Sequence, residues 1–338
     1  MEKEKRHESV SPGKILDMGW DFARVRTLTT AVELDIFGHI YRGNHTTEKV
    51  SSAANTNPRA TEMLLNALVG LELLKKNNGQ YQLTDDTAEF LVSEKPGFLG
   101  GMLKHMMDLH ENWGHLTECV KTGKPYESVD VQKKAEDFFP SMVKGLFNMN
   151  YQASKYAGTY LKEKNINVSS ILDVAAGSGV WGIGVAQQFE NAKLTALDFP
   201  EVCKVTKDFI SRYKLDSRAE CIEGNLRELN FGEEKYDLIT LGHICHSEGK
   251  ANTPKLLKKS WTALKPQGHL LIAEFTPNDE KTGPAVPLLF ALNMLVNTSE
   301  GDIFTFAELK KLLMDTGFKK VEKLEEAPSI SPLILAKK

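Results

Sequence analysis

Apolar residues recur at near-helical spacing over residues 14–41, from Ile15, Met18 and Phe22 onward to Phe37. This spacing predicts one or two amphipathic helices. The segment HTTEKVSSAAN offers a threonine cap to a short helix, and a second helix is expected from Pro58, which follows Asn57 as its cap. An Asn-Asn-Gly turn then separates two short alternating runs, which indicates a β-hairpin. Helix, helix and hairpin in this order are typical of a winged-helix domain.

The winged-helix pattern raises the possibility of DNA binding. A helix that reads the major groove needs several exposed Arg, Lys, Asn or Gln side chains near its start. The second helix, at 58–74, carries Arg59 and then Glu62 and Glu72, and is otherwise mostly apolar. We therefore expect the domain to pack against a second copy of the chain, and we keep DNA binding as the alternative.

Residues 98–161 are expected to be helical throughout, with faces rich in Met and aromatic residues. Such faces usually belong to a core, but a helical segment beside a catalytic domain also suits the wall of a substrate pocket, because methionine adapts to irregular shapes. Both interpretations stay open from the sequence.

The pattern changes at residue 169, where short apolar runs begin to alternate with helical stretches. The runs SSILDVAA, KLTALD, RAECIEG, YDLITLG and GHLLIAEF predict five strands, and helices are expected at about 180–190, 200–213, 251–265 and 305–316. Such alternation predicts a parallel sheet with right-handed crossovers. The C-terminal stretch after the last helix adds two strands as an antiparallel hairpin. The fold class is therefore α/β, a doubly wound seven-stranded sheet preceded by a mainly α domain.

The expected parts are a winged-helix domain at 1–97, a helical linker at 98–162 and a cofactor-binding catalytic domain at 163–338. At about 150 residues per domain, 338 residues are enough for at least one large core. With 42 Lys and Arg against 45 Asp and Glu, the formal charge of −3 offers no basic excess for nucleic acid. The composition is that of an ordinary globular protein.

The four cysteines are far apart and lack clustered histidines, which argues against a zinc site or a disulfide framework, so no metal is expected. The charged start MEKEKRHESV resembles neither a signal peptide nor an anchor. The longest weakly charged segment, at 283–296, has two prolines and is too short to span a bilayer. A cytoplasmic protein without membrane partners is expected.

Gly177, Gly179 and Gly182 form a Gly-x-Gly-x-x-Gly pattern between a predicted strand and helix, which indicates a nucleotide cofactor. A dinucleotide fits the spacing to Asp198, an acidic residue at the end of the next strand. Asp173 favours a different class of cofactor. A carboxylate directed at the loop would repel a pyrophosphate, but it suits the cationic centre and ammonium group of S-adenosylmethionine.

Successive segments then resemble one family. ILDVAAGSG (171–179), ALDFPEV (196–202), EGNL (223–226), YDLITLGHICH (236–246) and ALKPQGHLLIAEF (263–275) are similar to the motifs of class I S-adenosylmethionine-dependent methyltransferases. The chain resembles in particular the O-methyltransferases of plant phenolics and bacterial natural products, which carry an N-terminal winged-helix dimerisation domain. The resemblance covers nearly the full length and implies a homodimer.

The resemblance assigns residues to the cofactor. It implies that Asp173, Gly177, Ser178 and Gly179 surround the amino acid part, that Asp198 binds both ribose hydroxyls, and that Phe199 flanks the adenine. Asn225 and Leu226 stand where the family usually has Asp and an apolar residue, and the amide of Asn225 can still bond the adenine edge.

The resemblance also implies the chemistry. His246 matches the general base, which suits a neutral imidazole near pH 7, and Glu274 matches the glutamate that orients it. The family's second glutamate is replaced by Ile303, with Asp302 beside it, and Gly242 replaces a basic residue common in plant members. Tyr151 takes the place of a methionine that flanks the acceptor, and we expect its hydroxyl to contact a polar substrate or approach the methyl group.

The sequence thus predicts methyl transfer to a hydroxyl of a small, partly apolar molecule. Methylation of sulfur, nitrogen or carbon on the same fold stays open, because these acceptors need less base catalysis. A NAD-dependent oxidoreductase and a DNA-binding regulator are the more distant alternatives. The acceptor itself is not specified by these patterns.

Overall fold

The computed structural model describes residues 11–128, 132–329 and 331–338, without the side chains of residues 132–138 and 141. The chain forms two compact units, one ending at Lys104 and the other running from His105 to the C-terminus. Residues 105–162 therefore belong to the same unit as the sheet. No helix in the described ranges has the length and apolar character needed to cross a membrane.

The first unit contains the predicted helices and hairpin. Its elements are α1 (Gly13–Gly19), α2 (Asp21–Glu33), α3 (Ile36–Tyr41), α4 (Thr47–Ala53), α5 (Pro58–Gly70), β1 (Leu74–Asn77), β2 (Gln80–Leu83) and α6 (Asp85–Phe90). Thr46 and Asn57 cap α4 and α5 through their side-chain oxygens, as the sequence predicts. Asn78 and Gly79 adopt positive φ in the hairpin turn.

The segment 14–41 forms three helices rather than one or two. The break before α3 lies at Asp35, whose φ of 49° is left-handed and ends the run of helical backbone. Apolar residues recur on both sides of this break, exposed along α1 and part of α2 and buried in α3, so spacing alone did not reveal it. Ile36, Phe37 and Ile40 enter the unit's core with Leu65, Leu68 and Tyr81.

The expectation of helix throughout 98–161 is wrong. Helices α7 (Gly100–Asp108), α8 (His110–Gly114), α9 (Leu116–Thr122) and α10 (Gln132–Glu163) occupy most of it. The chain leaves helix at Gly123, whose φ of 67° is left-handed, and residues 123–128 are irregular. A glycine at this position ends α9 without the steric cost that a β-carbon would add.

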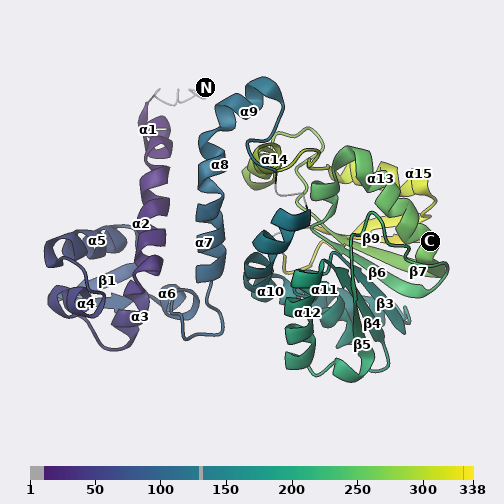
Figure 1. Ribbon diagram of the computed structural model, residues 1–338, viewed down its shortest axis with the longest axis horizontal. Helices are drawn as coiled ribbons and strands as arrows, with labels where there is room; N and C mark the ends of the chain where they lie inside the picture. Colours follow the sequence, from purple (N-terminus) through teal and green to yellow (C-terminus); the bar gives the residue numbers. More distant parts are fainter. Residues whose placement is uncertain (1–10, 129–131, 330) are drawn as a thin grey trace, which may run out of the picture. The chain divides into compact units, whose positions relative to one another are not determined.

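The seven-stranded sheet is confirmed. Its order is β5-β4-β3-β6-β7-β9-β8, with the strands β3 to β7 parallel and β8 and β9 closing it as an antiparallel pair (Figure 1). The strands are β3 (Ser170–Val174), β4 (Lys193–Asp198), β5 (Ala219–Glu223), β6 (Tyr236–Gly242), β7 (Leu264–Ala273), β8 (Lys320–Lys323) and β9 (Leu333–Lys337). The strands that follow β3 along the chain are added on one side as β4 and β5 and on the other as β6 and β7. In open α/β sheets, ligands bind at the carboxyl ends of the strands beside such a change of side.

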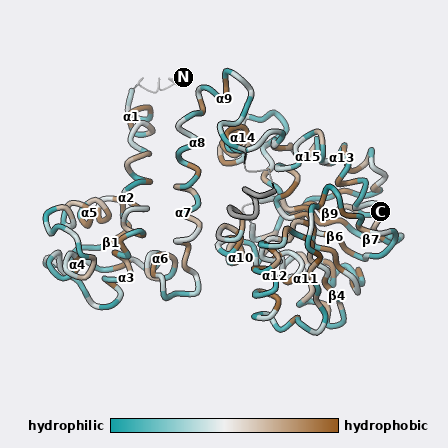
Figure 2. The backbone as a smooth tube through the Cα atoms, viewed as in Figure 1, coloured by the Kyte–Doolittle hydropathy of each residue, from teal (hydrophilic) through white to brown (hydrophobic). Residues whose placement is uncertain are grey.

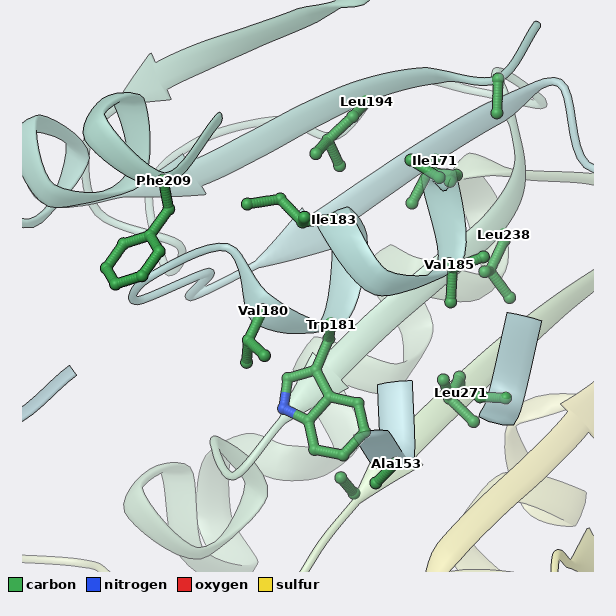
Figure 3. Packing of buried hydrophobic residues seen from close by; sticks show 14 of the residues in the cluster. Ala153, Ile171, Val180, Trp181, Ile183, Val185, Leu194, Phe209, Leu238 and Leu271 are labelled. Atoms are coloured by element: carbon green, nitrogen blue, oxygen red, sulfur yellow. The ribbon is translucent and has the colours of Figure 1, made fainter. Parts of the chain in front are cut away.

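Helices cover both faces of the sheet. They are α11 (Val180–Ala186), α12 (Pro200–Arg212), α13 (Cys245–Ala263), α14 (Ala285–Asn297) and α15 (Phe306–Thr316), with a short 3-10 helix at Asp216–Arg218. Helices α10, α11 and α12 enclose one apolar core against the sheet, and α13 and α15 enclose the other. The strands between them are correspondingly hydrophobic (Figure 2). In Figure 3, Trp181 and Val185 of α11 lie over Leu238 and Leu271 of the sheet.

Helix α14 was not predicted. Its sequence is apolar on nearly every side, so helical periodicity is weak, and Pro284 and Pro287 lie at its start. Proline is tolerated there, because the first backbone N–H groups of a helix have no partner within it.

A polar cluster ties together the amino ends of three strands. The carboxylate of Asp237 on β6 accepts hydrogen bonds from the N–H groups of Ser169 and Ser170 at 3.0 and 2.9 Å, and Lys265 lies 3.0 Å away. Burial would raise the pKa of Asp237, but the bonds from Ser169, Lys265 and Ser170 outweigh it and lower the pKa to about 2. The cluster aligns β3 and β6 at the edge opposite their carboxyl ends.

We expect Asp237→Asn to lower the free energy of unfolding at neutral pH by about 1.5–3 kcal/mol, the range for hydrogen bonds to a charged group. The pKa of Asp237 is about 2 when folded and about 4 in an unfolded chain. Its stabilisation is therefore present above about pH 4 and is lost as the pH falls through about 2. Denaturant unfolding at several pH values should show the gap between wild type and variant closing over this range. Asp315→Asn, which removes an exposed partner of Lys311, serves as the control, and an equal loss in both variants would contradict the assignment.

Candidate active site

The loop between β3 and α11 is built from left-handed backbone. Ala175, Gly177 and Gly179 have φ values of 52°, 59° and 77°. The Thr206 hydroxyl donates to the Gly177 carbonyl at 2.7 Å and fixes the loop to α12. Ser178 is buried within it. Two of the three positions are glycine, so the loop bends tightly and presents backbone rather than side chains to a ligand.

Asp198 ends β4 beside this loop and is partly exposed. Its Oδ2 accepts from the Gly177 N–H and its Oδ1 from the Phe199 N–H, both at 2.7 Å. Burial raises the pKa of Asp198 to about 6, although both hydrogen bonds lower it. Each oxygen keeps a second lone pair, so the carboxylate retains acceptor capacity toward a ligand.

Asp173 lies in a different environment from the one inferred from the sequence. Its carboxylate is fully buried, with Oδ2 accepting from the Gly182 N–H at 2.9 Å and Oδ1 from the Thr240 hydroxyl at 2.6 Å. Burial raises its pKa to about 7, against both bonds. The side chain therefore supports the start of α11 from below and is not directed at the loop's open side. This corrects the electrostatic reason for placing it against a cationic ligand.

The remaining predicted cofactor residues come to the same edge. Phe199 follows Asp198 at the start of α12. Asn225 and Leu226 follow β5, which pairs with β4 so that Glu223 lies opposite Asp198. The Asn225 side chain accepts from the Arg227 N–H at 2.9 Å. The structure thus brings the glycine loop, Asp198, Phe199 and the Asn225 loop together at the carboxyl ends of β3, β4 and β5.

His246 and Glu274 form a buried pair at the carboxyl ends of β6 and β7. Glu274 Oε1 accepts from His246 Nδ1 at 2.7 Å and from the Phe275 N–H at 2.9 Å, while Oε2 accepts from the His246 backbone N–H at 3.0 Å. Burial would raise the pKa of Glu274, but His246, His243 and the Phe275 N–H outweigh it and lower the pKa. An ionised carboxylate only accepts hydrogen bonds, so Nδ1 carries the proton.

In a neutral ring, Nε2 of His246 is consequently an acceptor. Within the described part of the chain, Nε2 has no hydrogen-bond partner and it reaches the accessible surface. The pair therefore leaves Nε2 without a protein partner at the edge of the sheet, which is the arrangement that a general base requires.

Aromatic rings lie near the His246 ring, and the sequence analysis did not identify them as site residues. Phe290 of α14 meets the His246 ring edge-on at 4.8 Å between centroids, and Phe275 lies 4.7 Å from Phe290. His243 lies 5.0 Å from Phe275, and its Nε2 is 2.8 Å from the Ser331 hydroxyl. Burial lowers the pKa of His243 to about 4, so it is neutral near pH 7. In the sequence, the position of His243 three residues before His246 was the one indication that it lies near the site.

Helix α14 is held by a second set of polar contacts. Asn112 Nδ2 of α8 donates to Asn297 Oδ1 at 2.6 Å, and Trp113 Nε1 donates to Asn293 Oδ1 at 3.0 Å. Because Phe290 lies on the same helix, these bonds connect the segment after residue 105 to the wall around His246. The segment after residue 105 thus contacts α14, and its role as the wall of a substrate pocket stays a prediction.

The second carboxylate of the family's base assembly does not reach the histidine ring. Ile303 is buried, and the Asp302 carboxylate pairs with Lys250 at 2.9 Å. Asp302 contributes its backbone instead, donating its N–H to the His246 carbonyl at 2.9 Å. The ring is therefore oriented by one carboxylate, Glu274.

Gly242 is explained by Trp181. A β-carbon at position 242 would lie 2.0 Å from Cδ1 and 2.3 Å from Nε1 of the Trp181 ring, which packs across the end of β6. Only glycine leaves room for this indole. Gly242 stands where plant members commonly have a basic residue, and in this chain it makes room for Trp181 in the first turn of α11.

Tyr151 makes its contacts away from the His246–Glu274 pair, and its contact with an acceptor stays a prediction. Its hydroxyl donates to Gln187 Oε1 at 2.5 Å, and its ring packs on Phe147 and Tyr213. Gln187 ends α11 far from the glycine loop. On α10, Val143 contacts Gly177 of that loop, and Tyr151 lies eight residues further on, about 12 Å along the helix axis. Its environment is the core at the other end of α11.

Comparisons with known proteins identify the family of the chain. The family model of the O-methyltransferase domain matches residues 113–319, and that of the O-methyltransferase dimerisation domain matches residues 19–93. The chain is similar to the S-adenosyl-L-methionine-dependent methyl transferase PigF of a Serratia species, with 26% identity over 83% of each chain. It is similar to 3-hydroxy-5-methyl-1-naphthoate 3-O-methyltransferase of Streptomyces sahachiroi, with 27% identity over 92% of this chain and 90% of that one.

A solved structure from Nostoc punctiforme, assigned as an O-methyltransferase, has 26% identity and a TM-score of 0.90, and covers 98% of this chain and all of that one. The match extends over both units, and the family models cover more than half of the sequence. The chain therefore belongs to the O-methyltransferase family of S-adenosylmethionine-dependent enzymes, as its sequence motifs predict.

Proposed function

We propose that the protein transfers a methyl group from S-adenosylmethionine to a hydroxyl of a small, partly apolar molecule. The observation that carries this proposal is the His246–Glu274 pair, whose histidine is held through Nδ1 at the same edge of the sheet as the glycine loop and Asp198. PigF, by its name, is a methyltransferase dependent on this donor, and the Streptomyces relative is a 3-O-methyltransferase.

The residues at the cofactor edge fit the donor. Asp198 has free acceptor capacity for the two ribose hydroxyls, and Phe199 and the Asn225–Leu226 loop lie where an adenine would follow. The left-handed backbone of the glycine loop admits the amino acid part, with Asp173 supporting the loop from beneath. When bound, S-adenosylmethionine supplies a methyl group on a positively charged sulfur.

The chain's own contribution is deprotonation and positioning. Glu274 fixes the Nδ1–H tautomer of His246, so Nε2 accepts the proton of an acceptor hydroxyl. Phe275 and Phe290 form apolar walls beside it, which exclude water and suit a flat apolar body.

Methylation of sulfur, nitrogen or carbon is the second candidate function. It is favoured because a single carboxylate contacts His246, where the family pattern has two.

We further propose that the chain forms a homodimer through its N-terminal unit. Helices α1 and α2 expose a row of large apolar side chains, with Trp20 and Phe22 each 65% exposed; the row comprises Ile15, Leu16, Met18, Trp20, Phe22 and Val25. The match to a dimerisation domain begins within this row. A second copy of the chain is the partner that both observations support.

A cytoplasmic location is also part of the proposal and agrees with four free cysteines.

His246→Ala should reduce methyl transfer by about 10²–10⁴-fold, because the acceptor loses its base. Affinity for S-adenosylhomocysteine should change by less than about twofold, since His246 lies outside the residues assigned to the donor. Turnover is measured with a hydroxyl compound found by an acceptor screen, and affinity by calorimetry, with a reduced nicotinamide dinucleotide as the non-binding comparison. His39→Ala is the control. Full turnover of the hydroxyl compound in His246→Ala would refute His246 as the base, and binding of the dinucleotide alone would overturn the proposed donor.

Affinity for S-adenosylhomocysteine should depend on the ionisation of Asp198. As the pH falls below its pKa of about 6, the carboxyl gains a proton and loses acceptor capacity toward the ribose. We expect the dissociation constant to rise by up to about tenfold per pH unit below that value. Calorimetry between about pH 8 and about pH 5 should show this slope in the wild type and a weaker, flatter dependence in Asp198→Asn. Identical slopes in the two proteins would assign the effect to another group.

Phe22→Asp should shift the protein from dimer to monomer, because a charge on the apolar row opposes its burial between two copies. Sedimentation velocity at micromolar concentration measures the change in mass. Met314→Asp, on an exposed position of α15, is the matched control and should remain dimeric. A wild-type monomer would refute the dimer, and a dimeric Phe22→Asp variant would place the interface elsewhere.

A further inference from the structure

The base-bearing turn is separated from the helix that follows it. Residues 245–248 form the first turn of α13, and Gly249, with φ 61° and ψ −171°, interrupts the helical backbone directly after them. A β-carbon at Gly249 would lie 1.8 Å from the Glu300 carbonyl oxygen, so the kink is packed against the segment after α14. The helical hydrogen bonding of α13 does not run continuously into this turn. The Thr253 hydroxyl of α13 donates to the Cys245 carbonyl at 3.0 Å, and contacts from other elements hold the turn further.

Three elements supply such contacts. Glu274 of the β7 end binds the His246 ring and backbone, and the Asp302 N–H binds the His246 carbonyl. The third contact comes from the opposite side. Arg227 Nε lies 3.0 and 3.1 Å from the two carboxylate oxygens of Glu248, two residues after His246.

The Arg227–Glu248 pair differs from the surface ion pairs of the chain. The Glu248 side chain is 6% exposed, whereas Arg227 is 43% exposed. A buried carboxylate without its partner is costly, while an exposed pair contributes little. The Arg227 side chain therefore determines whether Glu248 stays in its buried position.

Arg227 belongs to the loop assigned to the adenosine. Its backbone N–H donates to Asn225 Oδ1, which closes the turn after β5. Lys259, near the C-terminal end of α13, donates to the Leu226 carbonyl at 2.5 Å. Helix α13 thus holds the 225–227 loop at two places, and the place nearer the base is the Arg227–Glu248 pair.

We propose that Arg227 and Glu248 are positioning residues that fasten the adenosine-binding loop to the turn bearing His246. The pair keeps the 225–227 loop and the turn at 245–248 at a constant distance from each other. This distance sets the affinity for the donor and places the donor against the base. The inference rests on the proposed function, because it takes Asn225 and Leu226 as donor contacts. The pair acts through these neighbours and touches no reacting atom.

The test measures S-adenosylhomocysteine affinity by calorimetry for Glu248→Gln, Arg227→Gln and the double variant. Each single variant should weaken binding by about tenfold, and the double variant should weaken it no further, because the two residues act as one unit. Arg227→Lys should recover part of the affinity, since it restores the charge without the geometry of the guanidinium. Lys207→Gln is the control, because it breaks an exposed ion pair with Glu223 at the end of β5. Its affinity for S-adenosylhomocysteine should stay within about twofold of wild type.

Thermal unfolding of the ligand-free variants separates positioning from stability. The inference holds if the variants are folded at the temperature of calorimetry and still bind about tenfold more weakly. It is overturned if both single variants bind within about twofold of wild type, whatever their melting temperature, or if the two effects add fully in the double variant. A wild-type protein that does not bind S-adenosylhomocysteine refutes the proposed function instead.

Discussion

The buried carboxylate of Glu274 is the constraint on which the site depends. It is fully removed from solvent and receives three hydrogen bonds, two from His246 and one from the Phe275 N–H. A buried charge is tolerated only when it is bonded in this way. The same bonds select the tautomer of His246, hold its ring, and fix the start of α13. Without them, neither the direction of Nε2 nor the path of the turn would be determined.

The parallel sheet explains why the two halves of the site meet. Strands β3 to β7 all end at one edge, so the glycine loop, Asp198, the Asn225 loop, His246 and Glu274 each follow a strand end. Lateral order separates their roles. The loops after β5, β4 and β3 carry the residues assigned to the donor, whereas those after β6 and β7 carry His246, the proposed base, and Glu274. The strand order switches direction between these two halves, beside β3.

Individual departures from the family pattern have local physical causes. Gly242 is required by the Trp181 ring that occupies the neighbouring space. The missing second glutamate leaves Asp302 to stabilise His246 through its backbone N–H while its carboxylate binds Lys250. These substitutions keep the orientation of His246 but change what surrounds it, with Phe290 and a neutral His243 among its neighbours. The acceptor pocket is therefore expected to differ between this chain and the plant members.

Local patterns were sufficient for the strand count and for many of the helices, but not for α14 or for the helix breaks at Asp35 and Gly123. Alternating apolar runs predicted the strands, caps predicted α4 and α5, and motif spacing placed Asp198, His246 and Glu274 at strand ends, where the structure has them. Side-chain direction and long-range contact were decided only by the tertiary structure. Asp173 points beneath its loop to Gly182 and Thr240, Tyr151 is drawn to Gln187 at the far end of α11, and Phe290 reaches His246 from a helix whose apolar sequence showed no period. Sequence spacing fixes where a residue lies along its own element, but its partners come from distant segments, and only packing determines which of them it meets.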